Sequence, residues 1–220
     1  MSLSVAELWR YPVKSLAGER LSAATLQPDG IAGDRIVRVR GPEGVRTSRR
    51  QHRLLGLRGT LDDAGKARIN GHPWKSDAAL ALVRDAAGAD AWLEGHHELD
   101  RFDILPLLVA TDGAVAAFGR DIRRLRPNIV IGGVEGLAER DWPDAVLQIG
   151  NAIVRLDSLR GRCAMTTVDP DTLQVNPEVL RDIVRRFSNQ LCLNAEVVRV
   201  GTIRVGDRVT VSLAASSAPR

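Results

Sequence analysis

At positions 159–172 the chain reads Leu159-Arg160-Gly161-Arg162-Cys163-Ala164-Met165-Thr166-Thr167-Val168-Asp169-Pro170-Asp171-Thr172. Apolar residues lead into Cys163 and an Asp-Pro-Asp-Thr turn follows it, which places the thiol on a strand or at its mouth. Arg160 and Arg162 give the thiol basic surroundings, and these favour the thiolate, the form that attacks or binds a metal. Free cysteine is also among the most buried residue types, so an inert core thiol is the alternative.

The rest of the chain reads as many short strands with few helices. We expect strands over 3–11, 21–26, 35–40, 54–61, 104–110, 129–131, 152–156 and 164–168, and hairpins around Asn70-Gly71 and Gly206-Asp207, the latter joining 194–200 to 203–212. We expect helices over 77–87, 112–125 (with Thr111 as N-cap) and 177–187. This pattern predicts a β-rich α+β fold, a barrel or a sandwich, and no nucleotide-binding motif accompanies it. The tail 214–220 is predicted to be disordered.

Composition is that of a soluble globular protein, with 44% hydrophobic and 26% charged residues in 220. No apolar run approaches the roughly 18 residues of a membrane span, and the N-terminus lacks the pattern of a signal peptide. We therefore expect a cytoplasmic protein with two free thiols, Cys163 and Cys192. The four histidines show no metal-ligand spacing, so zinc is not expected.

The net charge of +4 permits an anionic partner. Seven arginines crowd into residues 35–53, but aromatic residues make up only 4% of the chain. A solvated basic face therefore explains the run better than a nucleic-acid groove, which needs stacking platforms. A smaller anion, such as a phosphate-bearing cofactor, fits the modest charge better.

Three further segments carry side chains able to hold an anion. In Tyr11-Pro12-Val13-Lys14-Ser15, one of three lysines stands beside a hydroxyl at a strand end, although it can equally be a solvent-exposed lysine. In Gly33-Asp34-Arg35, the arginine offers a planar fork of donors, or else forms a surface ion pair with Asp34.

The third segment is Arg126-Pro127-Asn128-Ile129-Val130-Ile131. Pro127 restricts the residue before it, so Arg126 is expected to be extended. Arg126 and Asn128 would then share one face of the chain and present a guanidinium and an amide. A helix-ending arginine followed by a turn-forming asparagine is the alternative.

Together these segments resemble those of MOSC domain proteins with an associated N-terminal β-barrel region. That family is related to the C-terminal part of molybdenum-cofactor sulfurases and to the amidoxime-reducing component. The similar segments, in the same order over almost the whole chain, are Tyr11-Pro12-Val13-Lys14-Ser15, Gly33-Asp34-Arg35, Arg126-Pro127-Asn128-Ile129-Val130-Ile131, positions 162–172 and Gly201-Thr202-Ile203-Arg204-Val205-Gly206-Asp207.

The resemblance implies a MOSC-type β-barrel over 96–214, preceded by an N-terminal β-barrel region over 1–95. It implies binding of the molybdenum cofactor, with the Cys163 thiolate as the protein ligand to molybdenum, a soft ligand for a redox-active centre. Asp169 matches an acidic catalytic position close to the metal. The positions that match those holding the pterin and its phosphate are Lys14, Ser15, Arg35, Thr111, Arg126, Asn128 and Arg162.

The chemistry implied is two-electron reduction of a small N-hydroxylated substrate, carried out by the cofactor and tuned by the protein. No cysteine cluster follows the barrel, so electrons would come from a separate ferredoxin-like or flavoprotein-like protein, and neither nucleic acid nor membrane is an expected partner. Two alternatives stay open. In one, Cys163 carries a persulfide for metal-sulfur cluster or cofactor assembly. In the other, the chain binds or delivers the pterin without catalysis.

Overall fold

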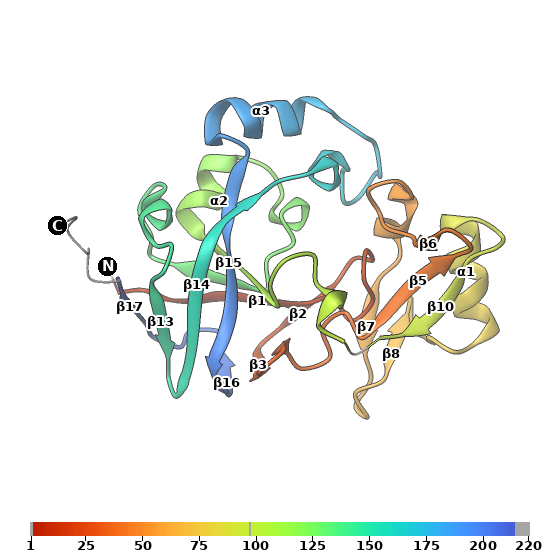
Figure 1. The fold of residues 1–220 in the computed structure, drawn as a ribbon, viewed down its shortest axis with the longest axis horizontal. Coiled ribbons are helices and arrows are strands. Elements are labelled where there is room, and N and C mark those ends of the chain that lie inside the picture. The colour runs from red at the N-terminus through yellow and green to blue at the C-terminus, as the bar shows by residue number, and fades with distance from the viewer. Residues whose placement is uncertain (1, 97, 214–220) are drawn as a thin grey trace.

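The computed structural model of the chain describes residues 2–96 and 98–213, and it is β-rich, as predicted (Figure 1). Its α-helices are α1 (Asp77–Ala87), α2 (Asp112–Phe118) and α3 (Glu178–Phe187). Its strands are β1 (Ser4–Arg10), β2 (Glu19–Leu21), β3 (Ala23–Gln27), β4 (Gly30–Ile31), β5 (Val37–Gly41), β6 (Gly44–Val45), β7 (Gly59–Leu61), β8 (Ala67–Ile69), β9 (His72–Pro73), β10 (Trp92–Gly95), β11 (Leu107–Thr111), β12 (Ile129–Gly132), β13 (Val146–Ile149), β14 (Ala152–Gly161), β15 (Gln190–Arg199), β16 (Gly201–Arg204) and β17 (Val209–Ser212).

The largest sheet runs in the order β17-β13-β14-β15-β11-β12-β1-β2. Its neighbours pair antiparallel except β11 and β12, which are parallel. Alternating apolar residues of these strands face a core that includes the wholly buried Leu8, Ile131, Leu147, Val154 and Leu193. Strand β14 is therefore fixed along its length, and Cys163 follows its end.

A second, smaller core lies beside the large sheet. It is built from β5, β6 and β10, from β7 to β9, and from α1, which lie at the right of Figure 1. Val37, Val39, Leu54, Ile69 and Val83 fill it. Strands β1 and β2 belong to the large sheet although they come first in the chain, so the division at residues 95 and 96 stays a prediction.

Helices α2 and α3 pack over one face of the large sheet (Figure 1). Phe118, Ile183 and Phe187 form the core between them with Leu191 and Cys192. Cys192 is wholly buried, and its burial raises the pKa of the thiol to about 11. This cysteine therefore stays protonated near neutral pH, which leaves Cys163 as the candidate reactive thiol.

The strand predicted over 54–61 is confirmed only in part, as β7, and the strand predicted over 164–168 is wrong. Residues His52–Gly56 form a 3-10 helix before β7, and Ala164–Thr167 form a second one directly after Cys163. In the second case Thr166 donates both its backbone N and its hydroxyl to the Cys163 carbonyl, at 3.0 and 2.9 Å. These local bonds satisfy the backbone within a turn and compete with sheet pairing.

Two other predictions need correction. The helix predicted over 112–125 ends at Phe118, because Gly119 adopts a left-handed conformation that closes it. A short 3-10 helix, Ile122–Arg124, follows. The closing hairpin is absent, since β16 pairs with β3 and β17 pairs with β13. The predicted disordered tail lies outside the described residues.

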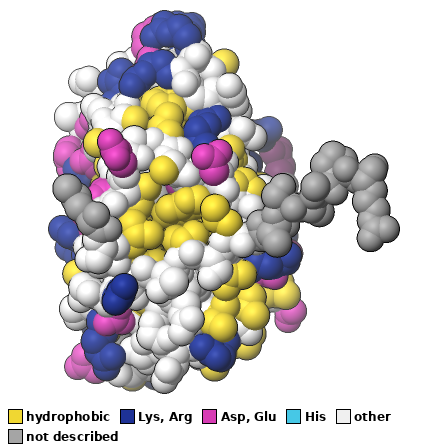
Figure 2. Space-filling view, turned by 90° about the vertical axis from the view of Figure 1, so that its left-hand side faces the viewer, with side chains coloured by type: hydrophobic (Ala, Val, Ile, Leu, Met, Phe, Trp, Pro, Cys, Tyr) yellow, Lys and Arg dark blue, Asp and Glu magenta, His cyan; other side chains and the backbone are white. Residues whose placement is uncertain are grey.

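Within residues 2–96 and 98–213, no helix combines the length and apolar character needed to cross a bilayer. The face at the left of Figure 1 carries a group of hydrophobic side chains among scattered charges of both signs (Figure 2). No single sign of charge dominates that face.

Candidate functional site

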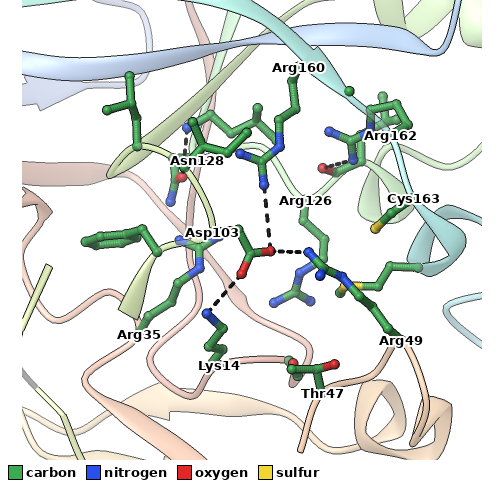
Figure 3. A pocket seen from close by; sticks show the side chains of 18 of the residues that line it. Lys14, Arg35, Thr47, Arg49, Asp103, Arg126, Asn128, Arg160, Arg162 and Cys163 are labelled. Carbon is green, nitrogen blue, oxygen red and sulfur yellow. Dashed lines mark hydrogen bonds and ion pairs between the residues drawn. The ribbon is translucent and has the colours of Figure 1, made fainter. Parts of the chain in front are cut away.

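A cavity of about 320 Å³ lies where the end of β14 meets the loops that precede β11 and β12. Seven cationic side chains line it, with Asp103 as the only acidic one in the described lining. The cations are Lys14, Arg35, Arg49, Arg124, Arg126, Arg160 and Arg162 (Figure 3). This excess of positive charge suits a multiply charged anion.

Cys163 lies just after the C-terminal end of β14, in agreement with the predicted position at the end of a strand. Its side chain lines the cavity and remains partly exposed. Its backbone is extended, with φ −134° and ψ 179°, and it forms the N-cap of the 3-10 helix that follows. Arg49 lies within interaction range of the sulfur. Burial lowers the pKa of the Arg49 guanidinium, but its interactions with Asp103 and with the Cys163 side chain outweigh burial and raise it.

Lys14 is held over the cavity by its backbone and by its side chain. Its backbone N donates to the Val37 carbonyl at 2.8 Å, which fixes the strand-end segment to β5. Its Nζ donates to the Arg101 carbonyl at 2.8 Å and lies 3.0 Å from Asp103 Oδ1. Ser15, which also lines the cavity, is buried and has a positive φ of 73°. Lys14 is thus positioned, and not free in solvent.

Arg35 is positioned by a buried network centred on Asp34. Asp34 is wholly buried and pairs with the Arg35 guanidinium, so the ion pair exists but is not on the surface. The same carboxylate accepts from Tyr11 N at 2.6 Å and from Asn128 Nδ2 at 3.2 Å. Asn128 Oδ1 in turn accepts from Leu108 N at 3.1 Å. The network ties the segment after β1 and the segments before β5 and β12 to β11 beneath the cavity.

Arg126 has φ of 57°, so the prediction that it is extended is wrong. The following proline disfavours the right-handed helical region but not the left-handed one, into which the chain turns after the 3-10 helix. The guanidinium stacks on the Tyr11 ring at 4.2 Å, and its burial lowers the pKa of Arg126 to about 10. Among the described residues, this guanidinium has no hydrogen-bond acceptor or ion-pair partner.

Arg160 and Arg162 precede the thiol in sequence and project into the same cavity (Figure 3). Arg162 Nη2 donates to the Leu125 carbonyl at 2.7 Å, while its Nε is buried without any partner. Arg160 Nη1 donates to Asn194 Oδ1 at 2.9 Å. Burial and the neighbouring charge of Arg162 lower the pKa of Arg160. An anion in the cavity would relieve both effects.

The cations converge on the carboxylate of Asp103 (Figure 3). Its oxygens lie 3.0 Å from Lys14 Nζ, 2.7 Å from Arg49 Nη2 and 3.7 Å from Arg160 Nη2. Burial alone would raise the pKa of Asp103, but these cations lower it below the ordinary value. The carboxylate therefore occupies the place in which an external anion would meet the same three side chains.

Replacing Asp103 with asparagine is expected to tighten binding of inorganic phosphate. The substitution removes the internal competitor and one like charge, which we expect to raise affinity about tenfold, or roughly 1.4 kcal/mol. Phosphate titration by calorimetry measures it, with Asp85→Asn as the matched control because Asp85 pairs with Arg53 outside the cavity. Weaker phosphate binding in the Asp103 variant would mean that the carboxylate organises the cations and does not compete for them.

Of the residues predicted from the sequence, Lys14, Ser15, Arg35, Arg126, Asn128, Arg162 and Cys163 all line this cavity. Thr111 and Asp169 do not. Thr111 is wholly buried, caps α2 and donates to Glu139 at 3.1 Å. Asp169 reaches the cavity only through Arg124, whose Nη2 lies 2.7 Å from its carboxylate.

Sequence reasoning missed Arg49, Asp103 and Arg124, and it gave Arg160 only a supporting place. The run of arginines over 35–53 was interpreted as a solvated basic face, yet Arg35 and Arg49 of that run line the cavity. The turn Gly33-Asp34 singled out Arg35, but only tertiary structure separates Arg49 from the other arginines of the run.

Two family models together match most of the chain. The MOSC N-terminal beta barrel domain matches residues 2–103 and the MOSC domain matches residues 112–210. The chain belongs to the MOSC family. The resemblance stated from five short segments is therefore confirmed, and the MOSC domain contains Arg126, Asn128, Arg162 and Cys163.

The relatives of this MOSC protein include amidoxime-reducing components and a molybdenum cofactor sulfurase. Mitochondrial amidoxime reducing component 2 of Macaca fascicularis is 29% identical over 138 residues, 53% of this chain and 40% of the relative. Mitochondrial amidoxime-reducing component 1 of Homo sapiens is 26% identical over 77% of the chain and 67% of its own length. Molybdenum cofactor sulfurase of Bombyx mori is 31% identical over 40% of the chain but only 10% of its own length. The chain thus spans about two fifths of the first of these relatives.

Among solved structures, the YuaD protein of Bacillus subtilis resembles this MOSC protein in fold. The two superpose with a TM-score of 0.51 and 15% sequence identity, over 96% of each chain. At this identity the likeness concerns the fold alone, and it supports the assignment of the architecture.

Proposed function

We propose that this MOSC protein binds the molybdenum cofactor in the cationic cavity and reduces small N-hydroxylated compounds, with electrons from a separate donor protein. The observation that carries the proposal is one partly exposed thiol at the rim of a cavity lined by seven cations and a single carboxylate. The names of the amidoxime-reducing relatives agree with that chemistry.

The side chains present fit a phosphate-bearing pterin with a metal. Arg162 Nε is buried without a partner, and the half-buried Arg126 guanidinium stacks on the Tyr11 ring without an acceptor in the described chain. A buried donor left unpaired costs about 1–3 kcal/mol, so an oxygen-rich anion would recover that cost. Cys163 offers the soft sulfur that a redox-active metal prefers.

The cofactor supplies the two-electron chemistry when bound. The protein's part is to hold and tune it. Lys14, Arg49 and Arg160 would bind the phosphate in place of Asp103, while Arg126 and Arg162 would face the remaining anionic groups. Cys163 would bind the metal as a thiolate, with Arg49 stabilising the negative charge on sulfur.

Two other predicted site residues, Asn128 and Asp169, would act by positioning the cationic side chains. Asn128 is wholly buried with its amide bonded to Asp34, Leu108 and Trp9, so we assign it to positioning Arg35 and the cavity floor. Asp169 would orient Arg124. Its carboxylate accepts from the backbone N of Thr172 and Asp171, and these bonds lower the pKa of Asp169. It would therefore stay ionised near neutral pH and act as an acceptor.

The direct test is the content of protein freshly purified from a host that makes the molybdenum cofactor. We expect close to one molybdenum and one fluorescent pterin per chain, and reduction of a simple amidoxime with a chemical reductant. Pterin and metal without any reduction would favour a delivery protein. A persulfide on Cys163 by mass spectrometry, with no molybdenum, would favour the sulfur carrier.

A further inference from the structure

A second cavity, of about 350 Å³, lies against the first. Arg124, Arg126 and Met165 line both cavities, so these three side chains form the wall between them. Met165 is two residues from Cys163 and lies in the same 3-10 helix that Cys163 caps. Its thioether is unbranched and adaptable, which makes this wall the part that a ligand can reshape.

The remaining surface of the second cavity is largely apolar and aromatic. The polar ends of its two rings point to other partners, since Trp9 Nε1 donates to Glu7 at 2.8 Å and the Tyr11 hydroxyl donates to the Pro127 carbonyl at 3.1 Å. The Tyr11 ring is buried beneath the Arg126 guanidinium, so Trp9 is the ring that contributes a face, and that face favours a flat apolar body. The lining residues of this kind are Trp9, Tyr11, Leu55, Val168 and Pro170.

The cavity also carries positive charge without an acidic residue among those described in its lining. Arg123 is neutralised by Asp121 and Asp171, and Arg124 by Asp169. Arg20, which also lines the cavity, pairs with Glu7 at 3.4 Å. Arg58 differs from them: in the described part of the chain its guanidinium has no ion pair and no hydrogen bond, and the residue is exposed at the cavity. The Arg126 guanidinium, on the shared wall, likewise has no ion pair and no hydrogen bond in the described part of the chain.

We propose that this second cavity binds the non-reacting part of the substrate, and that the preferred substrate has a flat apolar body bearing a carboxylate. The body lies on the Trp9 face and against Leu55, and the carboxylate meets Arg58. The shared wall then leaves the reacting end next to the cofactor cavity. The substrate role of the ligand rests on the proposed function, whereas the existence of the binding site does not.

The test uses protein made without the cofactor and two matched probes, 3-phenylpropionate and its neutral amide, titrated by calorimetry. We expect the carboxylate to bind about tenfold more tightly than the amide. Leu55→Trp, which fills the cavity, is expected to weaken both probes about tenfold or more. Arg58→Gln is expected to weaken only the carboxylate, by about fivefold, the scale of an exposed ion pair.

Two control variants separate this site from its neighbours. Arg50→Gln removes an exposed arginine that lines neither cavity, and it is expected to leave the binding of both probes unchanged. Lys14→Gln alters only the cofactor cavity, and it is also expected to leave both probes unchanged. Loss of carboxylate binding in the Lys14 variant, or equal binding of both probes, would overturn the proposal. Because Arg58 is exposed, Arg58→Gln is expected to fold. Its probe titration therefore tests the proposal even if Leu55→Trp does not fold.

A failure of the proposed function would give a different result from a failure of the second binding site. Absent molybdenum, with the probe pattern intact, would leave the second site standing and remove its substrate role. In protein that does load the cofactor, Arg58→Gln is expected to raise KM about fivefold for a carboxylated aryl amidoxime and to leave KM for the neutral one unchanged. An equal change for both substrates would contradict the assignment of the carboxylate to Arg58.

Discussion

Cys163→Ala is expected to lower the molybdenum content of the purified protein about tenfold or more, because the variant removes the soft ligand that a redox-active metal prefers. The fold should survive. Cys163 is partly exposed, and its backbone carbonyl, which anchors the following 3-10 helix, is retained. Metal analysis and pterin fluorescence on the same sample measure the effect, and we expect pterin to fall less than metal since the cations remain.

Cys192→Ala is the matched control. That thiol is wholly buried between α3 and the large sheet, so its removal should destabilise the protein by about 1–2 kcal/mol while leaving the molybdenum content of folded protein unchanged. Full molybdenum loading in the Cys163 variant would remove the metal-ligand role. Equal losses in both variants would mean that metal is lost through misfolding.

The parts of the fold that sequence predicted well are those whose signals are local. Helix α1 occupies the predicted range, with Ser76 as its N-cap, and α3 begins after Pro177. The hairpin of β8 and β9 turns at Asn70-Gly71, both with positive φ, as the residue pair demands. In each case the residues that decide the structure are adjacent in the chain.

The failures concern bonds that sequence patterns do not show. Residues 164–168 contain threonine and valine, which favour a strand. Thr166 nevertheless donates to the Cys163 carbonyl, and these bonds close a turn. The strand partners could not be read from the sequence either, since β16 pairs with β3 near the start of the chain and β17 pairs with β13. Short apolar runs specify a strand but not its neighbour.

The candidate site shows the same division. Lys14, Arg35 and Arg126 were found because proline or a turn marks each segment. Arg49 was not, since nothing in its neighbourhood separates it from Arg53, which pairs with Asp85 on the surface. Arg49 instead reaches Asp103, 54 residues away. Only the folded chain makes that distinction.

Asp34→Ala is expected to destabilise the protein by about 3–5 kcal/mol, the cost of removing one partner from a buried ion pair. Asp34 is wholly buried, and its loss strands Tyr11 N and the Asn128 amide as well as the Arg35 guanidinium. Equilibrium unfolding in urea measures the change. Asp85→Ala is the control, because its exposed pair with Arg53 should contribute less than about 1 kcal/mol.

Asp34→Asn separates charge from hydrogen bonding within this network. The amide oxygen can still accept from Tyr11 N, so we expect a smaller loss of stability, about 1–3 kcal/mol, from the unpaired Arg35 charge. Arg35 would then be free to meet an anion in the cavity, and inorganic phosphate should restore stability to the asparagine variant more than to the wild type. Equal stabilisation of both proteins by phosphate would show that Arg35 does not reach the bound anion, and that Asp34 serves the fold alone.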